Sequence, residues 1–313
     1  MVKVAVTSAT FSGNASLVQG VRQIDANARI NFPARKMAGD ELVEFLSDCD
    51  AAIIGTEQLS REVLEKLPKL KVVAKYGVGL DSLDLDCMAE RGVRLGWTGG
   101  VNRRSVAELT LAFMLGLTTN SFFTGYDLKR GEWRKQGGFE LTGKTVGLIG
   151  CGFIGEDVLR LLQPFQCRLL IHDILDKSAV AKVYGAQQVG FEELLVDSNV
   201  VSLHVPLTAR TRHMIGRKEL DGMGRETFLI NTARGELVDQ AALKSALQKD
   251  LILGAALDVF ELEPPEDEEF LALPNLMVSP HIGGNSRESV AAMGQAALDG
   301  LVREMEAAGL VRV

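Results

Sequence analysis

The sequence predicts an α/β protein built from two doubly wound domains, each with a parallel sheet. Short apolar runs alternate with helical patterns along most of the 313 residues, which is typical of this class. A glycine-rich turn, Gly150-x-Gly152-x-x-Gly155, follows one of the apolar runs, and an acid, Asp173, follows the next run. A chain of this length is long for one domain and comfortable for two.

Composition excludes several classes of protein. A net charge of −7 with 46% hydrophobic residues argues against a general nucleic-acid or membrane-surface binder. No apolar run approaches the roughly 18 residues that span a bilayer, and the N-terminus has a strand pattern rather than a signal peptide. We therefore expect a cytoplasmic protein. No metal site is expected either, because no ligand spacing is found among its cysteines, Cys49, Cys87, Cys151 and Cys167.

The first 98 residues have the pattern of a separate α/β unit. Strands are expected at 2–6, 51–54, 72–74 and 93–95, and helices at 40–46 and 60–67. Ser60 is a plausible N-cap of the second helix, and Pro68 ends it. The third strand runs into a loop, Lys75-Tyr-Gly-Val-Gly-Leu-Asp. That loop lies at the carboxyl end of a strand, where open α/β sheets bind ligands.

A long helix is expected after a candidate hinge, Trp97-Thr-Gly-Gly. Ser105 and Glu108 have the spacing of a capping box, in which the serine would be the N-cap. Apolar residues then recur on one face, at Leu109, Ala112, Phe113 and Leu117. The polar segment 129–139 is expected to be a surface connection.

The alternation resumes after residue 144. Strands are expected at 146–149, 168–171, 200–204, 228–231, 254–257 and 276–278, and helices at 154–163, 178–184, 191–196, 216–223 and 239–249. The acidic segment 261–269 is interpreted as a mostly solvated loop. The segment 286–308 has a helical pattern and is expected to return to the first domain. We therefore expect a first domain of residues 1–98, completed by 286–313, and a second domain of residues 99–285.

The glycine-rich turn predicts a dinucleotide site. Gly150 permits the tight turn, Gly152 lets the backbone approach a pyrophosphate, and Gly155 lets helix and strand pack closely. The helix N-terminus offers unpaired N–H groups to the anion. Asp173 stands where a carboxylate accepts hydrogen bonds from ribose hydroxyls and repels a 2′-phosphate, so NAD is favoured over NADP. The alternatives are a purely structural glycine turn and, for the cofactor, Lys177 as the one nearby cation.

Three polar residues follow predicted strands of the second half. They are Arg234, Glu263 and His281, and the parallel arrangement would bring them to one edge of the sheet. An arginine fork matches a carboxylate, a histidine exchanges protons near neutral pH, and a carboxylate beside it favours the imidazolium. Hydride transfer to a keto acid needs such groups. Taken singly, each residue could instead be a surface ion-pair partner, a solvated loop acid or part of a turn.

The chain resembles the D-specific 2-hydroxyacid dehydrogenase family, close to its phosphoglycerate-dehydrogenase-like members. Seven motifs carry the resemblance in the same order: Lys75-Tyr-Gly-Val-Gly-Leu-Asp, Gly100-Val-Asn-Arg-Arg-Ser-Val-Ala-Glu, Gly147-Leu-Ile-Gly-Cys-Gly-Phe-Ile-Gly, His204-Val-Pro-Leu-Thr, Asn231-Thr-Ala-Arg-Gly-Glu-Leu-Val-Asp, Ala256-Leu-Asp-Val-Phe-Glu-Leu-Glu-Pro and Ser279-Pro-His-Ile-Gly-Gly. The resemblance implies a Rossmann-type nucleotide-binding domain, a discontinuous flavodoxin-like substrate domain and an NAD-dependent oxidoreductase acting on a small 2-hydroxy or 2-keto acid.

The resemblance also implies roles for individual residues. Arg234 would hold the substrate carboxylate and carbonyl, His281 would be the acid/base and Glu263 its partner. The first domain would contact the substrate through Tyr76, Val78 and Gly79. The implied cofactor contacts are Val106, Gly150, Gly152, Phe153, Ile154, Gly155, Asp173, His204, Val205, Pro206, Thr211, Thr232, Ala233, Asp258, His281 and Gly283. Relatives of this kind are usually homodimers joined through the nucleotide domains, with the helix from Ser105 as the natural interface.

Some positions depart from the family pattern, and two rival functions stay open. The loop Ile54-Gly-Thr-Glu57 has an acid where relatives acting on phosphoglycerate carry an arginine, and Gly99 replaces a usual proline. We also expect no regulatory domain after Val313 of the kind that some phosphoglycerate dehydrogenases carry. A dinucleotide-sensing corepressor has the same fold but usually carries extra extensions. A formate dehydrogenase pairs its histidine with glutamine, so Glu263 favours a hydroxy acid.

Overall fold

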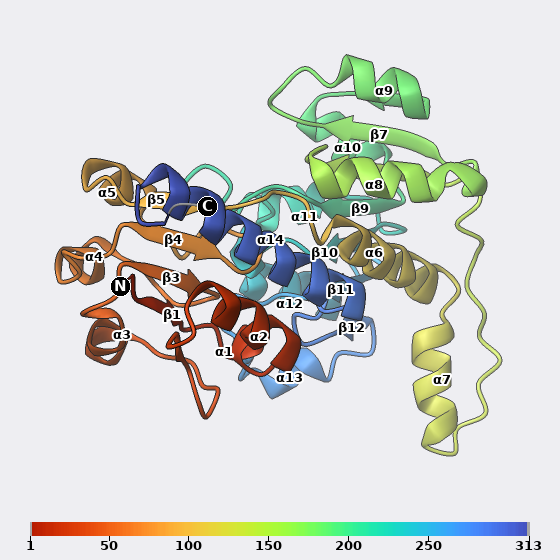
Figure 1. Ribbon diagram of the computed structural model, residues 1–313. Coiled ribbons are helices and arrows are strands. Elements are labelled where there is room, and N and C mark those ends of the chain that lie inside the picture. Colours follow the sequence, from red (N-terminus) through yellow and green to blue (C-terminus); the bar gives the residue numbers. More distant parts are fainter. Residues whose placement is uncertain (1, 312–313) are drawn as a thin grey trace. The chain divides into compact units, whose positions relative to one another are not determined.

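The computed structural model describes residues 2–311, which form two compact units (Figure 1). One unit takes the residues up to Asn102 together with those from Arg287 onward, and the other is Arg103–Ser286. Each unit is built on one sheet whose strand pairs are all parallel. The predicted class, two doubly wound α/β domains, is confirmed.

The first unit has a five-stranded sheet in the order β2-β1-β3-β4-β5. Its strands are β1 Val4–Val6, β2 Arg29–Ile30, β3 Ala51–Ile54, β4 Val72–Lys75 and β5 Arg94–Gly96. Its helices are α1 Ala9–Ser12, α2 Ala15–Ile24, α3 Gly39–Leu46, α4 Arg61–Glu65, α5 Leu85–Glu90 and α14 Arg287–Ala307. Helices α1, α2 and α5 and strand β2 were not among the expected elements. The elements α1, β2 and α5 are too short to show a period, whereas α2 does have helical spacing, at Leu17, Val21 and Ile24, and was overlooked.

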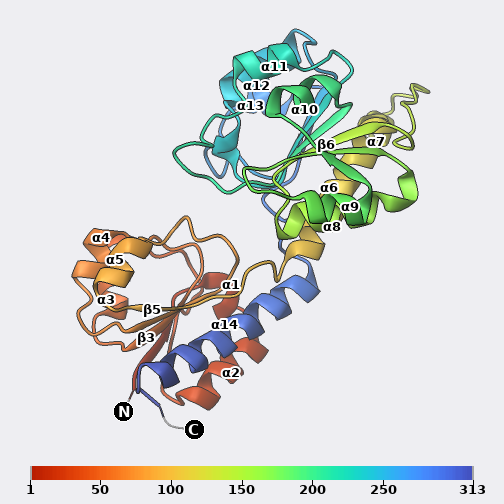
Figure 2. The same ribbon diagram turned by 90° about the horizontal axis from the view of Figure 1, so that it is seen from above.

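Helices cover both faces of this sheet. Side chains of α3, α4 and α5 form the core on one face, and side chains of α1, α2 and α14 form it on the other. Figure 2 shows α14 lying along the sheet beside α2. Two glycines permit the close approach of α14 to β5, because a Cβ on Gly96 would lie 2.6 Å from the Gly300 carbonyl carbon.

The second unit has a seven-stranded sheet in the order β12-β11-β10-β9-β6-β7-β8. Its strands are β6 Thr145–Ile149, β7 Arg168–His172, β8 Ala186–Gln188, β9 Val200–Leu203, β10 Phe228–Asn231, β11 Gly254–Leu257 and β12 Leu276–Val278. The strand order reverses between β6 and β9, and ligands of open α/β sheets bind at the carboxyl ends beside such a switch point. Sequence reasoning had found six of these strands and missed β8, which is short and polar.

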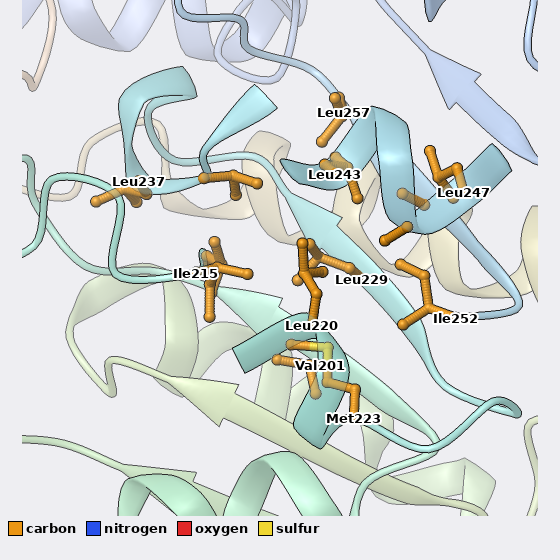
Figure 3. Packing of buried hydrophobic residues seen from close by; sticks show 14 of the residues in the cluster. Val201, Ile215, Leu220, Met223, Leu229, Leu237, Leu243, Leu247, Ile252 and Leu257 are labelled. Carbon is orange, nitrogen blue, oxygen red and sulfur yellow. The ribbon is translucent and has the colours of Figure 1, made fainter. Parts of the chain in front are cut away.

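The helices of this unit also lie on both faces of its sheet. They are α6 Arg103–Thr118, α7 Ser121–Lys129, α8 Phe153–Leu162, α9 Ser178–Tyr184, α10 Phe191–Asp197, α11 Arg217–Gly222, α12 Gln240–Gln248 and α13 Glu268–Leu271, with short 3₁₀ turns η1 Gln163–Phe165 and η2 Gly235–Leu237. Side chains of α6, α8 and α9 form one core, and those of α10 to α13 form the other. Figure 3 shows the second core, where Leu243 and Leu247 of α12 lie near Leu229 of β10.

The predicted capping box at Ser105 is wrong. Helix α6 begins at Arg103, so Ser105 lies inside its first turn rather than at the N-cap. The Ser105 hydroxyl instead donates to the Gly283 carbonyl at 2.6 Å, and Glu108 lies 3.9 Å from Arg104. A partner 178 residues away thus competes successfully with the local cap.

Two short helices lie where none was expected, one of them in a segment expected to be a loop. Helix α13 lies within the acidic 261–269 segment and its flank, and Asp267 caps it by accepting from the Phe270 N–H at 2.9 Å. Helix α7 precedes the polar connection and has no buried residue. Within residues 2–311, no single helix is long and apolar enough to span a membrane, although α6 and α7 pass that test as a pair bent by 72°.

Candidate active site

The glycine-rich turn lies between β6 and α8 at the switch point of the sheet. Gly150 has φ +95°, and a Cβ there would lie 2.6 Å from the His204 carbonyl oxygen. A Cβ on Gly155 would overlap the Gly150 carbonyl oxygen, so this glycine permits the close packing of α8 on the turn. Gly152 is different, since nothing lies within 4 Å of its hypothetical Cβ. Two glycines therefore serve packing, and the third leaves space open to a ligand.

The N-terminus of α8 is arranged to receive an anion. Gly152 is its N-cap and offers no side-chain cap, so the first-turn N–H groups are not satisfied by a local side chain. Phe153, the first residue of α8, is 54% exposed, and Ile154 follows it. The open space at Gly152 and the uncapped helix end together fit the pyrophosphate of a dinucleotide.

Asp173 directly follows β7 and is held beside the glycine-rich turn by hydrogen bonds. Its carboxylate accepts from the Cys151 N–H at 2.8 Å and from the Leu175 N–H at 2.9 Å. Each oxygen keeps a further lone pair for a ribose hydroxyl. The Lys177 ammonium lies 4.0 Å from Asp173 Oδ2. A carboxylate and a cation therefore share the position where an adenosine ribose, or its 2′-phosphate, would lie.

The segment after β9 contributes the other wall of the turn. His204 Nε2 lies 3.0 Å from the Ser202 hydroxyl, and burial lowers the pKa of His204 to about 3. His204 is therefore neutral at physiological pH. Val205 lies against the turn, since a Cβ on Gly150 would lie 2.7 Å from its side chain. Thr211 donates to the Pro206 carbonyl at 2.7 Å and closes this loop.

Residues implied at the nicotinamide end lie after β10 and β11. The Thr232 hydroxyl is buried 2.9 Å from the Thr110 hydroxyl of α6. Ala233 donates its N–H to the Asn231 side chain at 3.0 Å. Val106 of α6 is also buried, and its side chain lies near the space that a Cβ on Gly283 would take.

Asp258 organises the loop that carries His281. This carboxylate is 1% exposed, and it accepts from the Ser279 hydroxyl at 2.5 Å, the Ile282 N–H at 2.8 Å and the Gly283 N–H at 2.8 Å. The Asp258 carbonyl accepts from the His281 N–H at 2.8 Å. Sequence reasoning had missed this role, for which the only signal was an acid directly after a buried strand.

These hydrogen bonds hold His281 in an uncommon backbone conformation. His281 has φ +53°, a left-handed region that costs a non-glycine residue free energy and persists only when the surroundings enforce it. The enforcing contacts are the bonds from the 281–283 N–H groups to Asp258 and the bond from Ser105 to Gly283. The loop is therefore built to present one side chain in one direction.

His281 and Glu263 form a hydrogen-bonded pair. Nδ1 of His281 lies 2.7 Å from Oε2 of Glu263, and Oε1 of Glu263 accepts from the Phe260 N–H at 3.2 Å. The bond with Glu263 raises the pKa of His281, an effect that burial opposes in part. Burial in turn raises the pKa of Glu263, but the bond and charge of His281, the Phe260 N–H and the Arg234 charge together outweigh burial and lower that pKa overall. The pair therefore favours an imidazolium beside a carboxylate.

Arg234 lies near this pair at the end of β10. Its positive charge contributes to lowering the pKa of both Glu263 and His281. The Asn231 amide donates to the Arg234 carbonyl at 2.8 Å and fixes the turn, while the guanidinium donates to the Ala233 carbonyl at 2.7 Å. The structure thus brings Arg234, Glu263 and His281 together at one sheet edge.

The residues implied in substrate binding by the first unit follow β4. Tyr76 is buried against Phe11, with ring centroids 5.6 Å apart at 88°. Gly77 has φ +116°, and the Trp97 indole donates to the Val78 carbonyl at 3.0 Å. This turn leaves Val78 and Gly79 only partly buried at the carboxyl end of β4. Successive N–H groups in such a turn form a nest for an anion.

The acid of the 54–57 loop does not face solvent. Glu57 is 2% exposed, and its carboxylate accepts from the Gly55 N–H at 2.6 Å. Lys75, which is also buried, donates to the Gly55 carbonyl and lies 3.3 Å from the Ser82 hydroxyl. Glu57 and Lys75 therefore bond within the protein at this loop, where relatives acting on phosphoglycerate carry an arginine.

Comparison with known proteins identifies the second unit. Residues 111–283 match the NAD binding domain of D-isomer specific 2-hydroxyacid dehydrogenases. The chain belongs to this family. It is therefore an oxidoreductase of the D-2-hydroxyacid dehydrogenase type with NAD as cofactor, and the resemblance stated from the seven motifs is confirmed. The turn at Gly152, the N-terminus of α8 and Asp173 are the groups that fit this cofactor.

Individual relatives in this family carry different names. The chain is 36% identical to a D-3-phosphoglycerate dehydrogenase of Methanocaldococcus jannaschii over 94% of its own length, but it spans only 56% of that protein. It is 36% identical to a glyoxylate reductase of Korarchaeum cryptofilum, covering 86% of this chain and 82% of the relative. A D-lactate dehydrogenase of Aquifex aeolicus, solved with NAD and lactic acid, has a TM-score of 0.84 at 25% identity, covering 98% and 96% of the two chains.

Proposed function

We propose that this dehydrogenase interconverts a small D-2-hydroxy acid and its 2-keto acid, with Arg234, His281 and Glu263 as its catalytic residues. The observation that carries the proposal is the 2.7 Å contact between His281 and Glu263 beside the Arg234 guanidinium. A keto-acid reductase needs a cation for the carboxylate and a proton donor for the carbonyl oxygen. This edge of the sheet supplies both.

The proposed roles follow from the geometry of each side chain. Arg234 binds the substrate carboxylate through its planar fork and polarises the carbonyl. His281 uses Nδ1 for Glu263, which leaves Nε2 to deliver a proton to the carbonyl oxygen. Glu263 stabilises the imidazolium and fixes the orientation of the ring. The chemistry that NAD supplies when bound is hydride exchange at the carbonyl carbon.

The cofactor and the remaining substrate contacts complete the proposal. The N-terminus of α8 holds the pyrophosphate and Asp173 the adenosine ribose, which favours NAD over NADP. Thr232 and Asp258 lie toward the nicotinamide. The N–H groups of Val78 and Gly79 donate to the substrate carboxylate, and Tyr76 adjoins them. The other implied cofactor contacts lie in the same turn, in α6 at Val106, and in the loops after β9, β10 and β12.

We propose glyoxylate or hydroxypyruvate, rather than phosphohydroxypyruvate, as the keto acid that the enzyme reduces. Two relatives at 34–36% identity are a glyoxylate reductase and a hydroxypyruvate reductase. The 54–57 loop carries the buried acid Glu57 rather than a free cation for a phosphate.

A homodimer in the cytoplasm is the proposed working state. The resemblance implies the helix from Ser105 as the interface, and large apolar side chains are exposed just after that helix, on α7 and the segment that follows, namely Phe122, Tyr126, Leu128 and Trp133. In Figure 1 α7 stands apart from the sheet of its own unit. Exposed apolar surface of this kind marks a protein interface. Size-exclusion chromatography with light scattering tests the proposal, and a monomer at micromolar concentration would refute it.

Turnover of a substrate panel tests the proposed function. NADH oxidation is measured with glyoxylate, hydroxypyruvate and phosphohydroxypyruvate, using the wild type and the His281→Asn variant. Asparagine is chosen because it tolerates the left-handed backbone at this position better than alanine does. We expect turnover of the two smaller keto acids and loss of most activity in the variant. NADH binding without turnover of any keto acid would instead favour a dinucleotide sensor.

A further inference from the structure

The segment that carries Glu263 is packed against the Arg234 loop, backbone to backbone. A Cβ on Gly235 would overlap the Phe260 carbonyl and lie 2.5 Å from the Glu261 nitrogen. No larger residue fits there without moving one of the two loops. The proposed carboxylate-binding residue and the proposed partner of His281 therefore stand on loops that touch directly.

Glu261 fastens this segment from its other side. Its Oε1 accepts from the Gln240 N–H at 2.9 Å and lies 3.1 Å from Nε2 of His213. The Gln240 N–H belongs to the first turn of α12, where a carboxylate is favoured by the unpaired donors of the helix end. One carboxylate oxygen thus ties the segment to a helix and to the loop after β9.

The backbone of His213 is held by neighbouring residues, although its side chain is exposed. Its N–H donates to the Glu236 carbonyl at 2.7 Å, and its φ is +52°. The Ile215 N–H then bonds the Leu237 carbonyl at 3.1 Å, which continues the attachment of this loop to η2. The charged groups beside the ring are Glu261 and, on the neighbouring residues, Arg212 with Glu236 at 3.9 Å.

We propose that Glu261, anchored by His213 and by the Gln240 N–H, is a positioning residue for the proton-transfer pair. This inference rests on the proposed function. Glu263 is two residues from Glu261, and its own carboxylate turns back to the Phe260 N–H and on to His281. Releasing Glu261 therefore frees the Phe260–Glu263 turn to move, and the contact between Glu263 and His281 loosens while the His281 loop stays held by Asp258.

The test compares kcat, KM and the pH profile of keto-acid reduction in four proteins. Misplacement of a catalytic group by about 1 Å costs on the order of 100-fold, so we expect Glu261→Ala to lower kcat by roughly 10- to 100-fold with little change in the dissociation constant of NADH. The pH profile of keto-acid reduction by Glu261→Ala should also move to lower pH, because a looser contact with Glu263 raises the pKa of His281 less. Glu261→Gln keeps an acceptor oxygen and should restore most of the activity. Glu266→Ala, an exposed acid of the same segment, is the matched control and should resemble the wild type.

A double variant shows whether His213 and Glu261 act together. His213→Asn keeps a residue that tolerates positive φ but removes the ring, and combined with Glu261→Ala it should cost no more than Glu261→Ala alone. Wild-type kcat and pH profile in Glu261→Ala, equal losses in Glu261→Gln and Glu261→Ala, or additive losses in the double variant would each overturn the inference. A wild type that turns over no keto acid would overturn the proposed function, and this inference with it.

Discussion

Nδ1 of His281 lies 2.7 Å from Oε2 of Glu263, although the two residues are 18 positions apart in the sequence. The contact joins the loop after β12 to the loop after β11, two strands that are neighbours in the sheet. It occupies one ring nitrogen and leaves the other for chemistry. The pair raises the pKa of His281 and lowers that of Glu263, so each partner stabilises the charged form of the other.

The guanidinium of Arg234 should not be replaceable by an ammonium. Arg234→Lys keeps the charge but loses the planar fork, and the loss of a charged hydrogen-bond partner costs roughly 2–4 kcal/mol of transition-state binding. We expect kcat/KM to fall by about 30- to 900-fold at that cost. Steady-state kinetics with the best keto acid checks this, and near-normal kcat/KM in Arg234→Lys would remove Arg234 from the carboxylate site.

Cofactor preference should depend on Asp173 and Lys177 together. Asp173→Ala removes a ribose acceptor and a charge that repels a 2′-phosphate, and it releases the Lys177 ammonium that now lies 4.0 Å from the carboxylate. We expect the preference for NADH over NADPH to be smaller in Asp173→Ala than in the wild type. In the double variant Asp173→Ala/Lys177→Ala, which also lacks the ammonium, part of that preference should return. The measurement is the ratio of kcat/KM for NADH and NADPH. Equal use of both cofactors by the wild type would show that Asp173 does not select the cofactor.

Asp258 should affect both stability and catalysis, because it holds the loop that carries His281. Asp258→Asn replaces a buried acceptor of three hydrogen bonds with a group that donates on one side, which costs roughly 2–3 kcal/mol. We expect a lower thermal midpoint together with a large loss of kcat, because the His281 backbone is no longer enforced.

The matched control for Asp258 is Asp267→Asn, which alters another carboxylate that accepts a backbone N–H in the same unit. It caps the N-terminus of α13 through the Phe270 N–H and does not hold the His281 backbone, so kcat should be unaffected. Unchanged kcat in Asp258→Asn, or equal losses in both variants, would contradict a specific role of Asp258 in presenting His281.

The sequence predicted much of this fold because its signals are local. The apolar runs of β6, β9 and β10 are bounded by glycine or polar residues, and the glycine-rich turn lies between a strand and a helix as expected. The residues near His281 were also found from their places after strands. What escaped prediction depends on partners far away in the sequence. Ser105 matches a helix cap locally, yet its hydroxyl bonds Gly283.

The acidic 261–269 segment is a second case in which distant partners decide where side chains lie. Composition alone indicates solvated charge there, and several of its acids are exposed. Glu261 and Glu263 are exposed as well, yet their carboxylates bond the Gln240 N–H and His281. Gly235 lets their backbone approach the neighbouring loop, which no pattern within the segment reveals. The position of a polar side chain depends on partners that the fold brings near it, whereas the period of apolar residues can be read from the local sequence.

The pH dependence of keto-acid reduction by the wild type and Glu263→Gln tests the central claim most directly. His281 must be protonated to deliver a proton, so kcat/KM for reduction is supported below its raised pKa and falls as pH climbs through it. Glutamine keeps the shape of Glu263 but removes the charge that raises that pKa, so the reduction profile should shift to lower pH and the limb for hydroxy-acid oxidation should shift the same way. Superimposable profiles of the two proteins would contradict the proposed proton-transfer pair.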